Sequence, residues 1–242
     1  MRLPAAASLG PVLATLLDLV LPTCCAGCGC PGGMLCPTCA RCLAGPARPV
    51  TPWPTPAGFP DCRAVTAYDG PMRLALSAYK ERGRRELAGP LAQALGRAVG
   101  SHPAVVAGAP VVLVPVPSRR AAVRRRGGDP TRRLAGATAR ALTRRGIEVR
   151  LAPALRLCRP TADSAGLSAP DRWVNLQGAM SAHPSRAAGG GVVVVVDDLL
   201  TTGATLTEAS RALADAGCPG AMAAVVAATE RWPGLGQGSG PR

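Results

Sequence analysis

Apolar residues along the chain follow two patterns, short uninterrupted runs and longer stretches in which they recur every three or four positions. An uninterrupted run of about four to eight apolar residues predicts a buried strand, and the wider spacing predicts an amphipathic helix. From residue 62 onward the two patterns alternate, which is typical of an α/β sheet with helical connections. The predicted strands are 65–68, 111–116, 147–151, 192–196 and 221–228, and the predicted helices are 72–80, 87–99, 131–145, 170–176 and 205–216.

The strand predicted at 192–196 consists of valine alone. A strand with no polar alternation is buried on both faces, as in the centre of a parallel sheet that is covered by helices. We therefore predict an α/β fold, with a parallel sheet flanked by helices and this strand in its interior.

The N-terminal part of the chain has a different organisation. Apolar residues in 9–21 follow helical spacing with Asp18 on the opposite face, and the run is too short to span about 30 Å of hydrocarbon. A basic residue precedes the run, as in signal peptides, but the spacing favours a retained amphipathic helix and a cytoplasmic protein without a membrane span. The predicted units are a helix and cysteine module at 1–42, a Pro-rich linker without regular structure at 43–61, a large α/β domain at 62–232 and a disordered tail at 233–242.

The charge of the chain is strongly positive and comes almost entirely from arginine. Lys plus Arg number 28 against 14 acids, for a formal net charge of +14, and Lys80 is the sole lysine. Eleven of the arginines fall within 119–150, which holds two acids. A G+C-rich genome explains why the cations are arginine but not why they gather there, and the arginine fork suits phosphate groups. With six aromatic residues in all, the chain offers little for stacking nucleic-acid bases.

Seven of the 10 cysteines lie between residues 24 and 42. Cys25 with Cys28, and Cys36 with Cys39, form two CxxC pairs, each able to place two thiolates on one tetrahedral ion. A redox CxxC would need one pair only, at the start of a helix in a thioredoxin-like fold. We favour a structural zinc site, because metal binding would stabilise a module too small to bury a core. The further cysteines in this segment, which leave other ligand sets open, are Cys24, Cys30 and Cys42.

Two acids and a hydroxyl-rich turn follow the valine strand. The order is Asp197-Asp198, two leucines, then Thr201-Thr202-Gly203-Ala204-Thr205 and a helical pattern. A turn that opens a helix presents unpaired N–H groups to an anion, and ligands of α/β sheets gather at the carboxyl ends of strands. Gly203 would let the backbone approach a phosphate, and ionised carboxylates suit sugar hydroxyls or a cation. We predict a phosphate and sugar site; the alternative is an Asp pair that merely ends a strand and caps a helix.

A second cluster of charge follows the strand predicted at 111–116. The segment 117–128 carries five arginines and is predicted to be a loop before the next helix. If this strand is a parallel neighbour of the valine strand, the loop lies on the same side of the sheet as Asp197. Its guanidinium groups could then stabilise a departing pyrophosphate, although arginines in loops are commonly just solvated.

Residues 193–205 match the signature of type I phosphoribosyltransferases at every position, and over nearly the whole chain the sequence resembles the ComF family. The markers of this resemblance are Leu19-Val20-Leu21-Pro22 before the cysteine module, Tyr68-Asp69-Gly70, Lys80-x-Arg82-Gly83, Val114-Pro115-Val116-Pro117, Arg126-Gly127, Arg172-x-x-Asn175 and the Asp-Asp loop. Two segments depart from the family pattern. Gly128-Asp129 stands where an aromatic residue and Asn are typical, and Thr161-Ala162-Asp163-Ser164 stands where relatives often have Gln.

The resemblance implies a type I phosphoribosyltransferase-like domain that binds phosphoribosyl pyrophosphate (PRPP). In such a domain Asp197 and Asp198 hold the ribose hydroxyls and orient the sugar during catalysis, and Mg²⁺ bridges the pyrophosphate. The residues implied at the 5-phosphate are Thr201, Thr202, Gly203, Ala204 and Thr205; those implied near the pyrophosphate are Arg119, Arg126 and Lys80; and those implied as ligands of structural Zn²⁺ are Cys25, Cys28, Cys36 and Cys39.

Two functions are compatible with these features. In the first, the protein transfers phosphoribosyl from PRPP to an acceptor that the sequence does not identify. In the second, suggested by the ComF resemblance, it is an accessory protein of competence and DNA uptake that binds single-stranded DNA or competence proteins, with PRPP as a ligand or regulator. The net charge of +14 suits a polyanion, and the scarcity of aromatic residues indicates that any DNA contacts are electrostatic.

Overall fold

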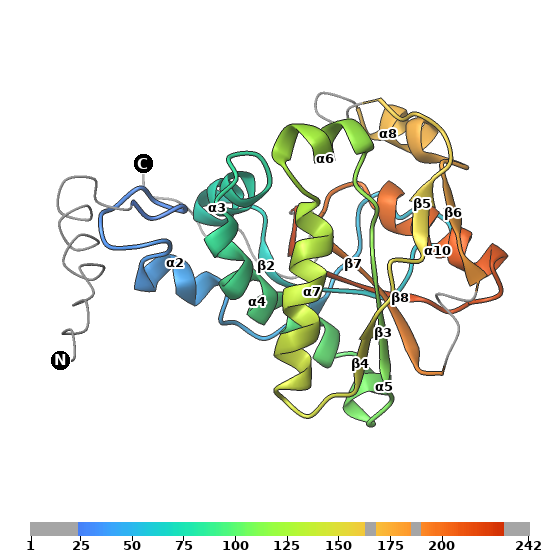
Figure 1. Cartoon of the computed structure of the whole chain (residues 1–242), viewed down its shortest axis with the longest axis horizontal. Helices are drawn as coiled ribbons and strands as arrows, with labels where there is room; N and C mark the ends of the chain where they lie inside the picture. Colours follow the sequence, from blue (N-terminus) through green and yellow to red (C-terminus); the bar gives the residue numbers. More distant parts are fainter. Residues whose placement is uncertain (1–23, 163–167, 185–189, 230–242) are drawn as a thin grey trace, which may run out of the picture.

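The computed structural model of the protein describes residues 24–162, 168–184 and 190–229 (Figure 1). The helix predicted at 9–21 and the tail predicted at 233–242 lie outside the described residues. Within the described ranges, helices and strands alternate along the chain, as the hydrophobic pattern predicts.

A six-stranded sheet lies at the centre of the molecule (Figure 1). Its strands in spatial order are β1 (Arg48–Pro49), β2 (Cys62–Ala67), β8 (Met222–Ala228), β7 (Val192–Leu200), β3 (Val111–Pro115) and β4 (Val149–Leu151). The pairings from β2 to β4 are all parallel, and the short β1 is antiparallel to β2. In the interior of the sheet, Val194 of β7 pairs with Met222 on one side and Leu113 on the other. These pairings confirm the predicted α/β class and the interior position of the valine strand.

Helices cover both faces of the sheet. One face packs on α3 (Gly70–Lys80), α4 (Ala88–Gly100) and α7 (Pro130–Thr143), and its core includes Val194 and Val196. The other face packs on α10 (Ala204–Asp215), and its core includes Val195. Successive valines of β7 therefore point to opposite hydrophobic cores, which is why this strand tolerates no polar residue before Asp197.

A second, two-stranded sheet stands beside the end of the main sheet that carries Asp197. β5 (Leu155–Leu157) pairs antiparallel with β6 (Met180–Ala182), and α8 (Ala169–Leu176) lies between them in the chain. Leu155 and Met180 pack into the core formed with α10. We call β5, α8 and β6 the hood. The hydrophobic pattern predicts α8 but neither β5 nor β6.

Three segments differ from their sequence predictions. The Pro-rich segment 43–61 contains β1 and buries Val50, because an edge strand tolerates the missing N–H of proline. The predicted arginine-rich loop contains the helix α6 (Arg120–Arg126). β7 runs through Asp197 and Asp198 to Leu200, because β8 continues to pair with it.

The cysteine module packs directly on the α3 and α4 side of the molecule. It includes the short helix α2 (Pro37–Cys42), and Cys25, Cys39 and Leu43 belong to the same hydrophobic core as α3 and α4. Two arginines fasten it further, since Arg84 Nη1 donates to the carbonyl of Cys24 at 2.7 Å and Arg97 Nη2 donates to the carbonyl of Leu43. The described residues also form two short helices, η1 (Arg85–Leu87) between α3 and α4 and α5 (Pro103–Val106) after α4. The division of the chain into domains stays a prediction.

Candidate functional site

Two adjacent acids of β7 form the polar centre of the candidate site. Asp197 and Asp198 are 9% and 4% exposed. The backbone N–H of Asp198 donates to Asp197 Oδ1 at 2.9 Å, and Lys80 Nζ, at the end of α3, donates to Asp198 Oδ1 at 2.8 Å. Lys80 keeps 35% of its side chain exposed. The sole lysine of the chain therefore neutralises one carboxylate of the pair.

The two carboxyl groups differ in their acidity. Burial, together with the neighbouring Asp198 charge, raises the pKa of Asp197 to about 8. Burial also opposes ionisation of Asp198, but the charge and hydrogen bond of Lys80 outweigh it and lower the pKa of Asp198. At neutral pH the pair thus holds one charge, with the proton on Asp197. A ligand that brings a cation or hydroxyl donors to Asp197 would favour its ionised form.

The turn after β7 leads straight into α10. The N-cap of α10 is Gly203, which has no side chain with which to cap the helix, and its φ is +81°. A Cβ at this position would lie 2.7 Å from Cγ of Pro52 and 3.1 Å from the ring of Phe59. Glycine is therefore required at position 203 because two residues of the Pro-rich segment 43–61 lie too close to leave room for a Cβ. The N–H groups of the first turn of α10 have no side-chain cap, which suits an anion.

A cavity of about 370 Å³ lies in front of Asp197. The predicted site residues among those that line it are Lys80, Arg119, Arg126, Asp197, Thr201 and Thr205. Its walls also include Leu157, Leu176 and Met180 of the hood. β3 and β7 are parallel neighbours, so the segment after β3 reaches the same cavity as the end of β7. Asp198, Thr202, Gly203 and Ala204 are not among the lining residues.

The two arginines predicted near the pyrophosphate are held by different partners. Arg126 makes a two-point ion pair with Glu81, with Nη2 to Oε1 at 2.5 Å and Nε to Oε2 at 3.1 Å. Arg119 Nη1 donates to the carbonyl of Thr161 at 3.4 Å. The nearby Asp129 caps α7 by accepting from the N–H of Arg132, and it also accepts from Ser118 Oγ. This cap gives Asp129 a structural role.

Sequence reasoning missed the site contacts of two residues of α8. Arg172 Nη1 donates to Thr201 Oγ1 at 3.3 Å, on the turn between β7 and α10. Asn175 makes two hydrogen bonds to the backbone of Ala162, accepting its N–H at 2.8 Å and donating to its carbonyl at 3.1 Å. The only signal for these residues was the family marker Arg172-x-x-Asn175. Through Arg172, the hood contacts the turn between β7 and α10.

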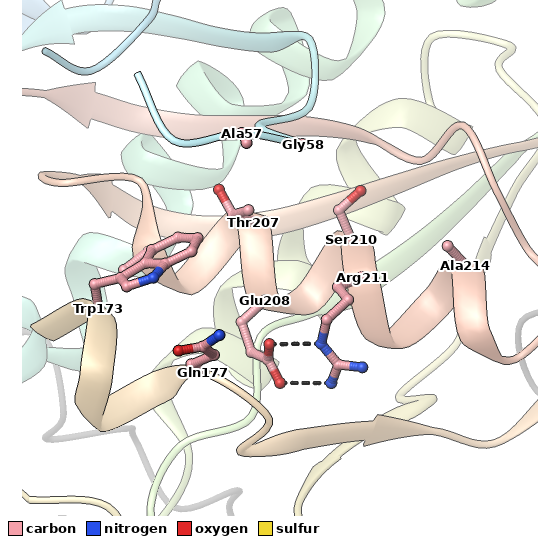
Figure 2. A pocket seen from close by; sticks show the side chains of 10 residues that line it. Ala57, Gly58, Trp173, Gln177, Thr207, Glu208, Ser210, Arg211 and Ala214 are labelled. Atoms are coloured by element: carbon pink, nitrogen blue, oxygen red, sulfur yellow. Dashed lines mark hydrogen bonds and ion pairs between the residues drawn. The ribbon is translucent and has the colours of Figure 1, made fainter. Parts of the chain in front are cut away.

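A second cavity, of about 330 Å³, lies between α8 and α10 (Figure 2). Its charged groups satisfy one another, since Arg211 donates through Nε and Nη2 to both carboxylate oxygens of Glu208 at 2.7 Å. Glu208 is 4% exposed and also accepts from the N–H of Met180 on β6 at 2.8 Å. Burial opposes ionisation of Glu208, but these hydrogen bonds outweigh it and lower its pKa. We interpret this group as an anchor between α10 and the hood.

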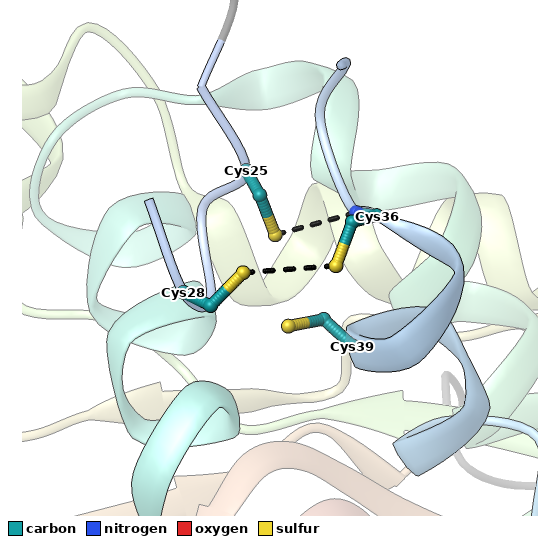
Figure 3. Close-up of side chains that lie close together, drawn as sticks. All are labelled: Cys25, Cys28, Cys36 and Cys39. Carbon is teal, nitrogen blue, oxygen red and sulfur yellow. Dashed lines mark hydrogen bonds between the residues drawn. The ribbon is translucent and has the colours of Figure 1, made fainter. Parts of the chain in front are cut away.

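The four cysteines of the CxxC pairs converge on one point (Figure 3). Their sulfurs all lie within 4.8 Å of one another, with Cys28 Sγ 3.6 Å from Cys36 Sγ. In a tetrahedral zinc site with Zn–S bonds of about 2.3 Å, the sulfurs stand about 3.8 Å apart. Gly27 is required in the first pair, because a Cβ there would lie 2.8 Å from Cys39 Sγ. The donor set and its size fit structural zinc.

The local backbone favours thiolates at this centre. Burial raises the pKa of Cys25, but the N–H groups of Cys36, Cys28 and Gly27 outweigh it and lower the pKa to about 6. Burial and the neighbouring sulfurs raise the pKa of Cys39. The sulfur of Cys30 lies 3.3 Å from that of Cys28 but outside the four-sulfur cluster.

No known family model and no curated protein matches the chain. In the described ranges, no helix is both long and apolar enough to cross a membrane. The functional assignment therefore depends on the residues and geometry of the two sites.

Proposed function

We propose that the protein is a ComF-like, PRPP-binding phosphoribosyltransferase that transfers phosphoribosyl to an acceptor. The observation that supports it best is the shared cavity in front of β7. There Asp197 and the uncapped start of α10 lie beside Arg119 and Arg126, which belong to the segment after the neighbouring parallel strand β3. Anion-binding N–H groups, a sugar-binding carboxylate and guanidinium groups are the three elements that PRPP requires.

Each part of PRPP has a matching group in this proposal. The 5-phosphate accepts hydrogen bonds from the first turn of α10 and from Thr201 and Thr205, and Asp197 accepts hydrogen bonds from the ribose hydroxyls. The pyrophosphate lies toward Arg119 and Arg126, where Arg126 exchanges its ion pair with Glu81 for the ligand. Asp197 offers carboxylate oxygens, which suit Mg²⁺. This ion usually binds proteins through one or two carboxylates together with the phosphates of a substrate, whose charge it neutralises.

The transfer itself needs no redox chemistry. A lone pair of the acceptor forms a bond to C1 of the ribose, the bond from C1 to the pyrophosphate oxygen breaks, and its electron pair leaves with pyrophosphate. The proton of the acceptor passes to solvent or to the released pyrophosphate. As C1 gains positive charge, the Asp197 carboxylate orients the sugar, and the arginines stabilise the negative charge that develops on the leaving group.

Titration calorimetry with PRPP and Mg²⁺ tests this function. We expect saturable binding at one site per chain, and we expect Asp197→Asn to abolish it because an amide cannot replace the carboxylate charge. The matched control is Asp215→Asn, which removes an exposed carboxylate at the far end of α10, in an ion pair with Arg211. Absence of heat with the wild-type protein, or equal loss in both variants, would reject PRPP as the ligand.

Binding of single-stranded DNA is the second candidate function, and the exposed arginines of α6 favour it. Arg120, Arg124 and Arg125 of this helix are exposed on one short segment. Binding of a single-stranded oligonucleotide should weaken steeply with salt, with a slope of about −0.7 per phosphate contact in a plot of log K against log salt concentration. Undetectable binding at low salt would exclude this role.

A further inference from the structure

A groove of about 860 Å³ opens beside the Asp197 cavity, between α6 and the hood. Five of the residues that line it are arginines, and no Asp or Glu is among the described residues that line it. We call it the arginine groove. Its arginines are Arg119, Arg120, Arg124, Arg156 and Arg159. They come from two sides, the first three from the N-cap and body of α6 and the last two from β5 and the segment after it.

Among the described residues, four of these arginines, Arg120, Arg124, Arg156 and Arg159, have no carboxylate partner. Arg156 Nε donates to the hydroxyl of Ser181 at 2.9 Å, and Arg159 Nη2 donates to the carbonyl of Gln177 at 2.8 Å. These partners are neutral, so they fix the direction of the guanidinium groups without cancelling their charge. No ion pair within the described ranges involves Arg120 or Arg124. Elsewhere on the molecule, by contrast, Arg126 and Arg211 are paired with acids.

The arginine groove is continuous with the Asp197 cavity. Pro117, Ser118, Arg119, Leu157 and Thr161 line both. A molecule whose anionic end lies in the groove can therefore extend past these shared residues toward Asp197. Thr201 and Thr205, the residues proposed at the 5-phosphate, line the cavity but not the groove. The groove thus provides a second anion site that PRPP in the cavity leaves open.

We infer that the phosphoribosyl acceptor is a small phosphate-bearing molecule of nucleotide size, with its phosphates in the arginine groove and its nucleophile in the Asp197 cavity. This inference rests on the proposed transferase function. Arg120 and Arg124 on one side of the groove and Arg156 and Arg159 on the other have no ion pair among the described residues. Opposed arginine forks of this kind bind phosphate oxygens through paired, charge-assisted hydrogen bonds.

The shape of the groove favours a small ligand over a nucleic-acid strand. Its volume is within the range of about 300–1,000 Å³ that is usual for small-molecule sites. No aromatic side chain is among the described residues that line it, whereas sequence-tolerant strand binders stack bases on aromatic rings. Leu155 and Leu157 provide an apolar surface beside the arginines, which suits the uncharged part of a nucleotide-sized molecule.

Titration of the full-length protein with inorganic tripolyphosphate, with and without saturating PRPP and Mg²⁺, tests the inference. We expect tripolyphosphate to bind in both conditions, because the groove stays open when PRPP is bound. The double variant Arg120→Gln/Arg124→Gln should weaken tripolyphosphate binding roughly tenfold or more and leave PRPP affinity unchanged. The matched control is Arg140→Gln/Arg144→Gln, which removes two exposed arginines at the end of α7.

The outcomes separate the inference from the function on which it rests. Competition between PRPP and tripolyphosphate, or equal weakening by the control pair, would overturn the groove as a distinct site. A single-stranded oligonucleotide that displaces tripolyphosphate and binds about 100-fold more tightly would assign the groove to a polymer and overturn the small acceptor. Absence of PRPP binding with groove-dependent tripolyphosphate binding would reject the transferase function, and with it the acceptor role, while retaining the anion site.

Discussion

At the scale of single residues, the unequal acidity of the two carboxyl groups has a measurable cost in stability. Because the pKa of Asp197 is raised to about 8, the folded protein holds a proton that an unfolded chain releases above pH about 4. Stability should therefore fall as the pH rises from about 4 to 8. We predict that Asp197→Asn removes this fall and is more stable than the wild type by about 0.5–2 kcal/mol at pH 8, as is common when a functional residue is replaced.

Urea unfolding at pH 5 and pH 8 measures this effect. The expected result also separates loss of PRPP binding from loss of folding, since the variant that cannot bind would be the more stable protein. Parallel pH profiles for the two proteins, or a variant that is less stable at pH 8, would contradict the proposed protonation of Asp197.

A second residue-scale prediction concerns His102, whose side chain is fully buried. Its Nε2 lies 2.9 Å from the carbonyl of Ala223 and therefore carries the proton, and its Nδ1 is 3.4 Å from a carboxylate oxygen of Asp61. Burial lowers the pKa of His102. Its stabilising contribution is thus complete above pH about 6.5 and is lost as the pH falls below that value.

Because Asp197 acts in the opposite direction over the same range in both proteins, the prediction concerns their difference: between pH 7.5 and 5.5 we expect the melting temperature of the wild type to drop relative to that of His102→Gln. The substitution keeps a donor for the carbonyl of Ala223 while removing the titrating ring. An equal drop in the variant would show that other groups govern this pH range.

The residues of the site differ in how well the sequence could predict them. Asp197 and Thr201 lie at and just after the end of a buried strand, so the local pattern was enough to place them near one another, and both line the cavity. Their chemical roles stay a prediction. Arg172 and Glu81 became part of the site only through contacts with Thr201 and Arg126. Such contacts depend on how α8 and α3 pack, which no local spacing encodes.

At the scale of elements, the hydrophobic pattern located the helices and strands that have an apolar face and missed the helices and strands that lack one. α6 is a helix in which only Ala122 is buried, so it has no periodic apolar signal. Arginine is nonetheless a good helix former, and Gly127 ends the helix in the left-handed conformation with φ +63°. The three-residue strands β5 and β6 are likewise too short to show alternation. They form because α10 and the main sheet supply their packing.

The anchor between α10 and the hood gives an element-scale prediction. Glu208→Gln removes a buried charge that Arg211 and the N–H of Met180 share. Breaking a fully buried ion pair costs about 3–5 kcal/mol. Because Arg211 is 41% exposed, we expect a smaller loss of about 1–3 kcal/mol. Hydrogen exchange should also accelerate at the amides of β5 and β6.

The matched control is again Asp215→Asn, which removes the other carboxylate that Arg211 contacts. That pair is solvent-exposed, so its loss should cost at most about 0.5–1 kcal/mol and should leave exchange in the hood unchanged. Equal effects of the two substitutions would show that the hood does not depend on Glu208.

At the scale of the whole molecule, α3 connects the two candidate sites. Near its start, Pro71 packs against Gly27 of the cysteine module, and its last residue, Lys80, pairs with Asp198. Between them, Met72, Leu76 and Tyr79 are buried in the common core. The sequence predicted both sites but not this connection, because Lys80 and Asp198 are far apart in the chain and meet only in the folded sheet.

This connection predicts that metal removal acts beyond the cysteine module. Purified protein should contain one zinc per chain, and chelation or Cys36→Ser should remove it. Without the metal, thiolates gathered within 4.8 Å repel one another, so the module loosens and α3 loses the support of Gly27 at its start. Lys80 would then hold Asp198 less firmly, and PRPP affinity should fall several-fold while the sheet remains folded.

Metal analysis, calorimetry and far-ultraviolet circular dichroism of the same sample distinguish the possible results. Cys158→Ser, which changes an exposed cysteine outside the module, is the control and should retain zinc. If the zinc-free protein binds PRPP as tightly as the loaded protein, α3 does not transmit the effect and the module acts as an independent unit. If affinity and secondary structure are lost together, zinc supports the whole fold, because the buried Cys25 and Cys39 belong to the same core as α3 and α4.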